Sequence, residues 1–224
     1  MKTQKGFTLI EIAIVLVIIG LLLGGVLKGQ ELITSARVRN LISQQDGIKA
    51  AFFGFQDRYR ALPGDYRDAN SNINCSTACA VGDGNGRIDG TSEPFYAWHH
   101  LNASGFLNGT YVAASGVTAP LDTNSPKNPY GTYLQLIYDN TYGDPTASPA
   151  LPDKHNLKSG NQVPIEIIAE VDRKIDDGVP YQGSFQFSEY VQPGGTQPTI
   201  AHCVDTGKWR IAGSSANCGA SSIF

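Results

Sequence analysis

The 224-residue sequence has no excess of basic residues, because 17 lysines and arginines stand against 20 aspartates and glutamates. The resulting formal charge of −3 excludes a strongly basic nucleic-acid binder at the level of composition. The sequence also lacks the catalytic motifs GxSxG and HExxH and the phosphate-binding P-loop. No repeat with a period of about 20 to 50 residues is present, which excludes solenoids and propellers.

The remaining composition is that of a folded protein. Hydrophobic residues make up 41% of the chain and charged residues 17%, which excludes a disordered polar chain. Twelve prolines and 25 glycines are incompatible with an all-helical body, and because they follow no period they exclude a collagen-like structure.

The apolar residues are concentrated near the N-terminus. The run from Phe7 to Leu27 contains 21 residues with one charge, that of Glu11. As a helix this run would be roughly 30 Å long, the thickness of the bilayer hydrocarbon. Lys2 and Lys5 precede it, and basic residues before an apolar segment keep that end of the chain in the cytoplasm.

Two ordinary interpretations of this segment meet difficulties. A secretory signal has a shorter apolar region followed by an A-x-A-like cleavage site, and no such site follows Leu27. A plain membrane anchor leaves Glu11 unexplained, because a carboxylate near the hydrocarbon costs about 3 kcal/mol without a partner.

The stretch Gly6-Phe7-Thr8-Leu9-Ile10-Glu11 resembles the processing motif of type IV pilins and the related pseudopilins. The resemblance implies that a dedicated membrane peptidase cuts between Gly6 and Phe7 and that Phe7 is then N-methylated. It also makes Glu11 the fifth residue of the mature chain. Because cleavage frees an α-amine, we expect Glu11 of a neighbouring subunit to neutralise it and to set the register of assembly. An unprocessed anchor is the alternative.

The apolar pattern continues on one side from Leu32 to Tyr59, mostly at spacings of three and four residues, and no proline occurs before Pro63. We therefore expect one helix from about residue 7 to about residue 60. The expected division of the chain is a leader at 1–6, an apolar helix half at 7–28, an amphipathic helix half at 29–60 and a globular domain at 61–224.

The globular part is expected to be mixed. A short helix is predicted over residues 95–106, and strands over 133–139, 163–171 and 184–190. A last pair of strands is predicted at 200–204 and 208–212 around the turn Asp205-Thr206-Gly207, and residues 172–178 are predicted as a turn between strands. The fold class is therefore α+β, a small antiparallel sheet of three to five strands on the C-terminal half of a long helix, as in pilins.

Four cysteines, Cys75, Cys79, Cys203 and Cys218, lie in the part expected to be exported, where disulfides form, and they allow three connectivities. We expect Cys75–Cys79 as a tight local loop and Cys203–Cys218, which resembles the C-terminal disulfide loop of many pilins. A zinc site is the alternative, although the spacing is not a recognised zinc pattern. The four histidines are His99, His100, His155 and His202.

Residues 82–89, GDGNGRID, resemble an acidic calcium loop. Asp83, Asn85, the carbonyl of Arg87 and Asp89 fall on alternate ligand positions, and Glu93 lies one residue past the usual bidentate acid. The first position would be occupied by a valine, Val81, which cannot coordinate through its side chain. A glycine-rich turn without metal is the alternative, and no other cofactor is expected.

The sequence therefore predicts a structural subunit of a type IV pilus-like filament and not an enzyme. A type II secretion pseudopilin and a minor-pilin adhesin or binding module are alternatives, and a membrane-tethered hydrolase is a third class without a supporting motif. Expected partners are other pilin subunits, the prepilin peptidase and an inner-membrane assembly platform. The expected location is the bacterial inner membrane, as a single-pass protein, and then a periplasmic or extracellular filament. Removal of Lys2 and Lys5 lowers the 17 basic residues to 15 against 20 acidic ones, and the formal charge of −5 disfavours nucleic acid.

Overall fold

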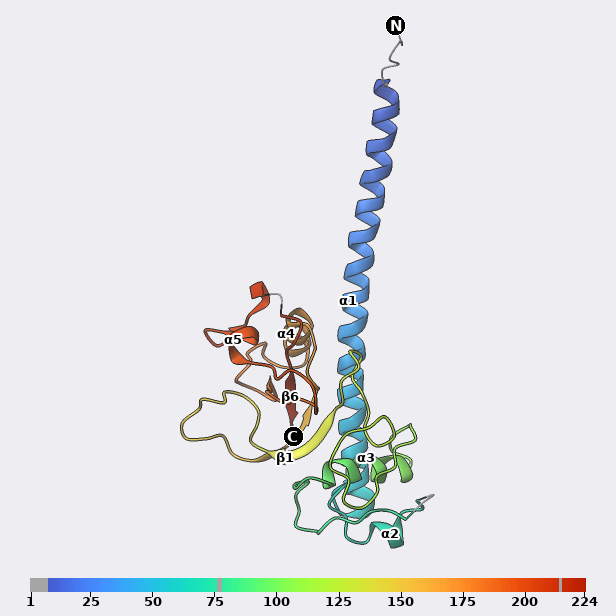
Figure 1. Ribbon diagram of the computed structural model, residues 1–224, viewed down its shortest axis with the longest axis vertical. Coiled ribbons are helices and arrows are strands. Elements are labelled where there is room, and N and C mark those ends of the chain that lie inside the picture. The colour runs from blue at the N-terminus through green and yellow to red at the C-terminus, as the bar shows by residue number, and fades with distance from the viewer. Residues whose placement is uncertain (1–7, 76–77, 214) are drawn as a thin grey trace. The chain divides into compact units, whose positions relative to one another are not determined.

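A computed structural model describes residues 8–75, 78–213 and 215–224 of the chain (Figure 1). The leader and the two residues at the expected cleavage site, Gly6 and Phe7, lie outside the described residues. The boundary between the two compact units of the chain falls between Arg37 and Val38. The first unit contains the N-terminal part of one long helix, and the second contains all of the other elements.

Helix α1 extends from Leu9 to Tyr59, 51 residues. No proline interrupts it, and it ends where Arg60 takes a left-handed φ of 53° shortly before Pro63. Its first buried residue is Val38, and six more follow at helical spacing: Leu41, Gln45, Ile48, Ala51, Phe52 and Phe55. The long helix expected from the sequence is confirmed.

A four-stranded antiparallel sheet in the order β1-β2-β6-β3 forms the centre of the second unit. The expected α+β class is therefore confirmed. The strands are β1 (Gln135–Asp139), β2 (Lys154–Lys158), β3 (Phe185–Phe187) and β6 (Ala220–Ile223). The sequence predicted β1 and β3 but missed β2 and β6, which occupy the middle of the sheet.

The predicted strand pair near residue 205 is only partly correct. The turn is present, and Thr206 and Gly207 both have positive φ (48° and 74°), as a two-residue hairpin of type I′ requires. However, β4 (Val204–Asp205) and β5 (Lys208–Trp209) form a separate two-stranded sheet. The preceding residues are helical in α5 (Ile200–Cys203), and η1 (Ile211–Gly213) is a short 3-10 helix.

The predicted strand over residues 163–171 is wrong, because this segment belongs to helix α4 (Ile165–Ile175). The buried residues Ile165, Ile168, Ala169 and Asp172 repeat at the spacing of one helical face. Glu170 forms ion pairs with Arg173 and Lys174, which follow it at i+3 and i+4. Glu166, one turn earlier, is exposed. The helix thus has one apolar and one charged face.

Residues 172–178 are consequently not a turn between strands, and that prediction is also wrong. Asp172 is in the last turn of α4, and the chain then turns from the end of the helix toward β3. The predicted helix at 95–106 is present as α3 (Glu93–Ala103), which starts two residues earlier because Pro94 sits in its first turn. A four-residue helix, α2 (Ala69–Asn72), precedes it.

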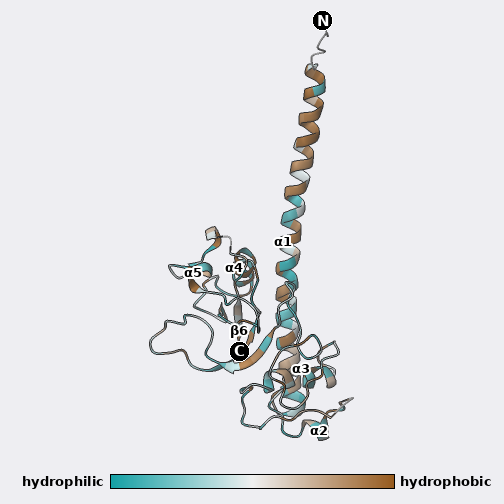
Figure 2. Cartoon of the chain, viewed as in Figure 1, coloured by the Kyte–Doolittle hydropathy of each residue, from teal (hydrophilic) through white to brown (hydrophobic). Residues whose placement is uncertain are grey.

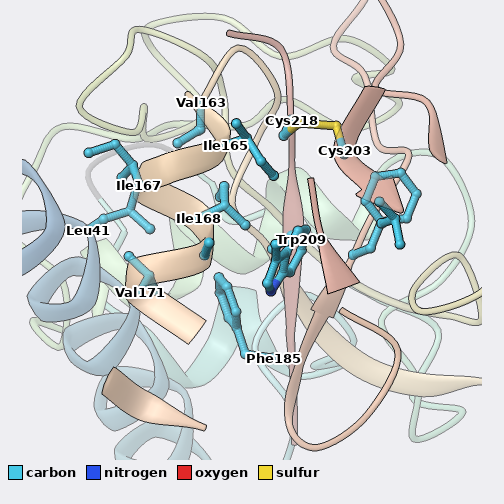
Figure 3. Packing of buried hydrophobic residues seen from close by; sticks show 14 of the residues in the cluster. Leu41, Val163, Ile165, Ile167, Ile168, Val171, Phe185, Cys203, Trp209 and Cys218 are labelled. Atoms are coloured by element: carbon cyan, nitrogen blue, oxygen red, sulfur yellow. A yellow bond between two sulfur atoms is a disulfide. The ribbon is translucent and has the colours of Figure 1, made fainter. Parts of the chain in front are cut away.

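Two apolar clusters hold the second unit together. In the first, Val38 and Leu41 of α1 pack with the buried face of α4, with β3 and with Trp209. Figure 3 shows this cluster, with α4 between Leu41 and the residues around Phe185. In the second cluster, Phe52 and Phe55 of α1 pack with Trp98 of α3 and with Leu136 and Leu157 of the sheet.

Candidate functional site

The N-terminal half of α1 presents a largely apolar surface, which is interrupted by Glu11 near its start and by Lys28, Gln30 and Glu31 further along. From Leu9 to Ile33 its large apolar side chains are exposed, and Figure 2 shows the hydrophobic colour along this part of the helix. By length and composition α1 is the one helix, among the residues that the structure describes, that could cross a membrane. Exposed apolar area of this extent needs lipid or other helices to cover it.

Glu11 closes a reciprocal cap at the start of this helix. The backbone N–H and the hydroxyl of Thr8 donate to Oε2 of Glu11, at 2.8 Å and 2.7 Å. The backbone N–H of Glu11 donates to Oγ1 of Thr8 at 3.3 Å. This is the capping box that the pattern T-x-x-E specifies, and it satisfies N–H groups that the first turn leaves without partners. Thr8 is a site residue that the sequence analysis missed, although its pattern is visible in the sequence.

The glycine-rich loop from Gly82 to Asp89 folds around two carboxylates that lie outside it. Asp65, which follows the end of α1, accepts the backbone N–H groups of Asn85 at 3.0 Å and of Gly86 at 2.8 Å. Glu93, at the start of α3, accepts those of Asp83 and Asp89, both at 3.0 Å. The loop therefore turns its backbone donors inward onto the two acids.

Three carboxylates meet inside this loop. One oxygen from each of Asp65, Asp83 and Glu93 lies within 4.8 Å of the others, and Asp65 and Glu93 are only 4% and 8% exposed. Burial raises the pKa of Asp65, and burial together with the neighbouring acids raises the pKa of Glu93. Oxygen donors of this class are those that Ca²⁺ takes.

The structure brings together only part of the predicted calcium set. Asp83 and Glu93 are in the cluster, whereas Oδ1 of Asn85 accepts the backbone N–H of Arg87 at 2.7 Å. The amide of Asn85 donates to Asp83 at 3.0 Å and reaches Asp89 at 3.5 Å. Asp65 brings a third carboxylate into the cluster, and it was not predicted because it lies 18 residues before Asp83 in the chain.

Comparison with known proteins identifies the N-terminal segment. A family model for the prokaryotic N-terminal methylation motif matches residues 1–27. This motif is the prepilin signature of type IV pilins and pseudopilins. The resemblance seen in the sequence is therefore confirmed, and the apolar helix with this motif fits a membrane-anchored precursor. No curated protein and no solved structure matches the chain.

The family that carries the prepilin signature is structural rather than enzymatic. In general it implies assembly with other pilin subunits and processing by the prepilin peptidase. Gly6 and Phe7, the predicted processing residues, fall within the matched segment.

Disulfides join Cys75 to Cys79 and Cys203 to Cys218, the two pairs expected from the sequence. Cys203 and Cys218 are buried in the first cluster, and Figure 3 shows their bond near Ile165 and Trp209. The loop between them contains the β4-β5 hairpin and several exposed residues.

The acidic residues in the last turn of α4 and directly after it have structural partners. Nε1–H of Trp209 donates to Oδ2 of Asp172 at 2.6 Å, and the backbone N–H of Phe185 donates to Oδ2 of Asp176 at 2.8 Å. Asp177 accepts the backbone N–H of Val179 at 2.8 Å. Although Asp172, Asp176 and Asp177 lie close together, their hydrogen bonds fix the end of α4 and the approach to β3.

Proposed function

We propose that the chain is the precursor of a structural subunit of a type IV pilus-like filament. In this proposal the prepilin peptidase cuts between Gly6 and Phe7, Phe7 is methylated, and the mature subunit is held in the inner membrane by the apolar half of α1. The observation that carries the proposal is the prepilin motif at residues 1–27, which includes the start of an apolar helix whose large side chains are exposed in the described chain.

Assembly would then bury the apolar half of α1 among other subunits in a periplasmic or extracellular filament. Removal of apolar area from water contributes about 25 cal/mol per Å². Transfer from lipid gains no such contribution, so association of the helices from the membrane depends on close packing. Two GxxxG pairs, Gly20/Gly24 and Gly25/Gly29, would permit such close packing, because no described atom outside α1 lies near these glycines.

The test of this proposal is the intact mass of the protein extracted from membranes of cells that contain a prepilin peptidase. The expected product begins at Phe7 and carries one methyl group, whereas cells without the peptidase should give the full-length chain. A Gly6→Leu variant should stay unprocessed while still entering the membrane. A mature N-terminus at any residue other than Phe7 would contradict the proposal.

Calcium binding by Asp65, Asp83 and Glu93 is a second candidate activity of the globular part. It is favoured by the convergence of three carboxylates of which two are nearly fully buried. Both oxygens of Asp65 and both oxygens of Glu93 accept backbone N–H groups, and the lone pairs that remain on these four oxygens give the loop capacity for a hard cation.

A further inference from the structure

His99 contrasts with its neighbour His100 in its hydrogen bonding. Both are almost fully buried on α3. Nδ1 of His100 accepts the backbone N–H of Gly64 at 3.0 Å, and its Nε2 lies 2.8 Å from the carbonyl of Ala80, so both nitrogens are used. Within the described part of the chain, Nδ1 of His99 has no hydrogen-bond partner although the residue is 2% exposed.

Two cysteines lie next to this imidazole. One ring nitrogen of His99 and the sulfurs of Cys75 and Cys79 all lie within 4.8 Å of one another. In the disulfide neither sulfur carries a hydrogen, so the sulfurs cannot donate to Nδ1. A buried nitrogen without a partner is costly, so this lone pair calls for a ligand.

The unpartnered nitrogen is the feature that points to a ligand. A buried imidazole nitrogen without a hydrogen-bond partner keeps its lone pair available, and imidazole nitrogen is a common ligand of Zn²⁺ in proteins.

We propose that Cys75, Cys79 and His99 form a zinc site when the cysteines are reduced. Reduction of the disulfide takes two electrons from a thiol or phosphine reductant and gives two thiols. The two protons come from the reducing thiols, which become a disulfide, or from water when a phosphine is oxidised to its oxide. Zinc binding then releases two protons to solvent as two Zn–S bonds form, and Nδ1 of His99 supplies the third ligand. Two sulfurs and one imidazole nitrogen are a known protein donor set for Zn²⁺.

Charge favours Zn²⁺ over Cu⁺, the other cation that thiolates favour. Two thiolates neutralise a divalent ion, whereas a monovalent ion would leave one negative charge in an apolar cluster. The described residues add no fourth histidine, cysteine or carboxylate to the group. Cys75 is only partly buried, so a water molecule can reach the fourth position from its side.

This site also revises the sequence argument against zinc. The spacing of the four cysteines alone is not a zinc pattern, whereas the fold places Cys75 and Cys79 next to His99, 20 residues after Cys79. The other cysteine pair provides an internal comparison. In the described chain, Cys203 and Cys218 are not part of any such group with a histidine.

The test uses the full-length chain purified in detergent and reduced with a phosphine. Alkylation and mass analysis of one portion identify which cysteines are reduced. The reduced chain should bind one Zn²⁺, and Co²⁺ in its place should give the absorption of a tetrahedral thiolate complex. The oxidised chain should bind neither ion.

Variants locate the ligands. Cys75→Ser with Cys79→Ser should abolish binding, and His99→Phe should weaken zinc binding at least tenfold and change the Co²⁺ spectrum. His202→Phe is the matched control, because His202 is exposed and bonded to Thr199, and it should bind like the parent. The melting temperature of the oxidised His99→Phe variant shows whether its fold is intact. The single variant Cys79→Ser is a second test, because it removes one thiolate, leaves the imidazole in place and should change the Co²⁺ spectrum.

Three results would overturn the proposal. These are failure of the reduced chain to bind zinc, zinc binding by a folded His99→Phe variant equal to that of the parent, and retention of zinc in Cys79→Ser with an unchanged Co²⁺ spectrum. Binding of Cu⁺ by the same residues in the presence of excess Zn²⁺ would overturn the choice of metal.

Discussion

Asp172 is a fully buried carboxylate that accepts a hydrogen bond from the indole of Trp209. Burial raises its pKa to about 6 from an ordinary value of 3.8. The folded state therefore holds a proton that the unfolded state releases between these two values. Stability from this residue is complete below about pH 4 and is lost as the pH rises through about 6.

Replacement of this residue, Asp172→Asn, should flatten the pH dependence of stability. The parent should lose about 2–3 kcal/mol more than the variant between pH 4 and pH 7, since one pKa unit corresponds to about 1.4 kcal/mol. The measurement is the free energy of unfolding of both proteins across that range, and the difference between them isolates this residue from other titrating groups. Parallel curves for the two proteins would show that Asp172 does not control this window.

Substitution of Asp65 tests the calcium hypothesis. If Ca²⁺ binds there, the melting temperature of the parent should rise in millimolar calcium, and at 100 times the Kd the gain is about 2.7 kcal/mol. Because the pKa values of Asp65 and Glu93 are raised, protons compete with the ion and the gain should shrink as the pH falls. Asp65→Asn should abolish the shift.

Asp68→Asn is the matched control for this experiment, because Asp68 is exposed and only three residues away. It should keep the full calcium response. If millimolar calcium leaves the parent's melting temperature unchanged, the loop is the metal-free turn that the sequence analysis held as the alternative.

At the scale of elements, strand β2 carries a buried charge into the middle of the sheet. Lys158 is 1% exposed, and its amine donates to Oδ1 of Asp139 at 2.9 Å and to Oγ1 of Thr141 at 2.8 Å. Its neighbour on the same strand, Asn156, is also buried, and accepts from the hydroxyl of Ser221 on β6 at 2.7 Å. The central strands are thus joined by polar contacts as well as by the ladder.

Lys158→Met should destabilise the protein by about 3 kcal/mol, because it leaves the half-buried Asp139 without its cation. Lys154→Met on the same strand is the control, since Lys154 is exposed, and it should change stability by less than about 0.5 kcal/mol. Denaturant unfolding of the three proteins gives both values. Equal stabilities of the two variants would mean that the buried pair contributes nothing to the sheet.

These polar strands explain what the sequence could and could not reveal. β1 and β3 were predicted because they are rich in aromatic and branched residues, but β2 (KHNLK) and β6 (ASSI) offer no apolar alternation. The run VPIEIIAEV at residues 163–171 is compatible with the period of a strand or of a helix. Only Pro164, directly before the first residue of α4, and the ion pairs of Glu170 with the last turn favour the helix. The contacts that Asp65 and His99 make with residues distant in the sequence depend on the fold, so no local sequence pattern reveals them.

At the scale of the whole molecule, the chain combines an N-terminal helix half with exposed apolar side chains and a unit with its own apolar clusters. The exposed apolar helix half suits a membrane or a filament core, and the unit with its own apolar clusters suits the space outside the membrane or core. If cleavage occurs as proposed, an α-amine is created next to the capping box of Thr8 and Glu11. Glu11 can then neutralise the amine of a neighbouring subunit while Thr8 still caps the helix.

Glu11→Val should therefore leave cleavage and membrane insertion intact but reduce incorporation into filaments by at least tenfold, because the α-amine of each subunit would enter an apolar environment unpaired. Glu31→Val is the matched control, since Glu31 lies on the same helix and pairs with Lys28 within its own chain, at 2.7 Å. Intact mass reports cleavage, and the ratio of sheared filament protein to membrane protein reports assembly. Normal filaments from Glu11→Val, or an equal defect in Glu31→Val, would show that Glu11 serves only to cap the helix.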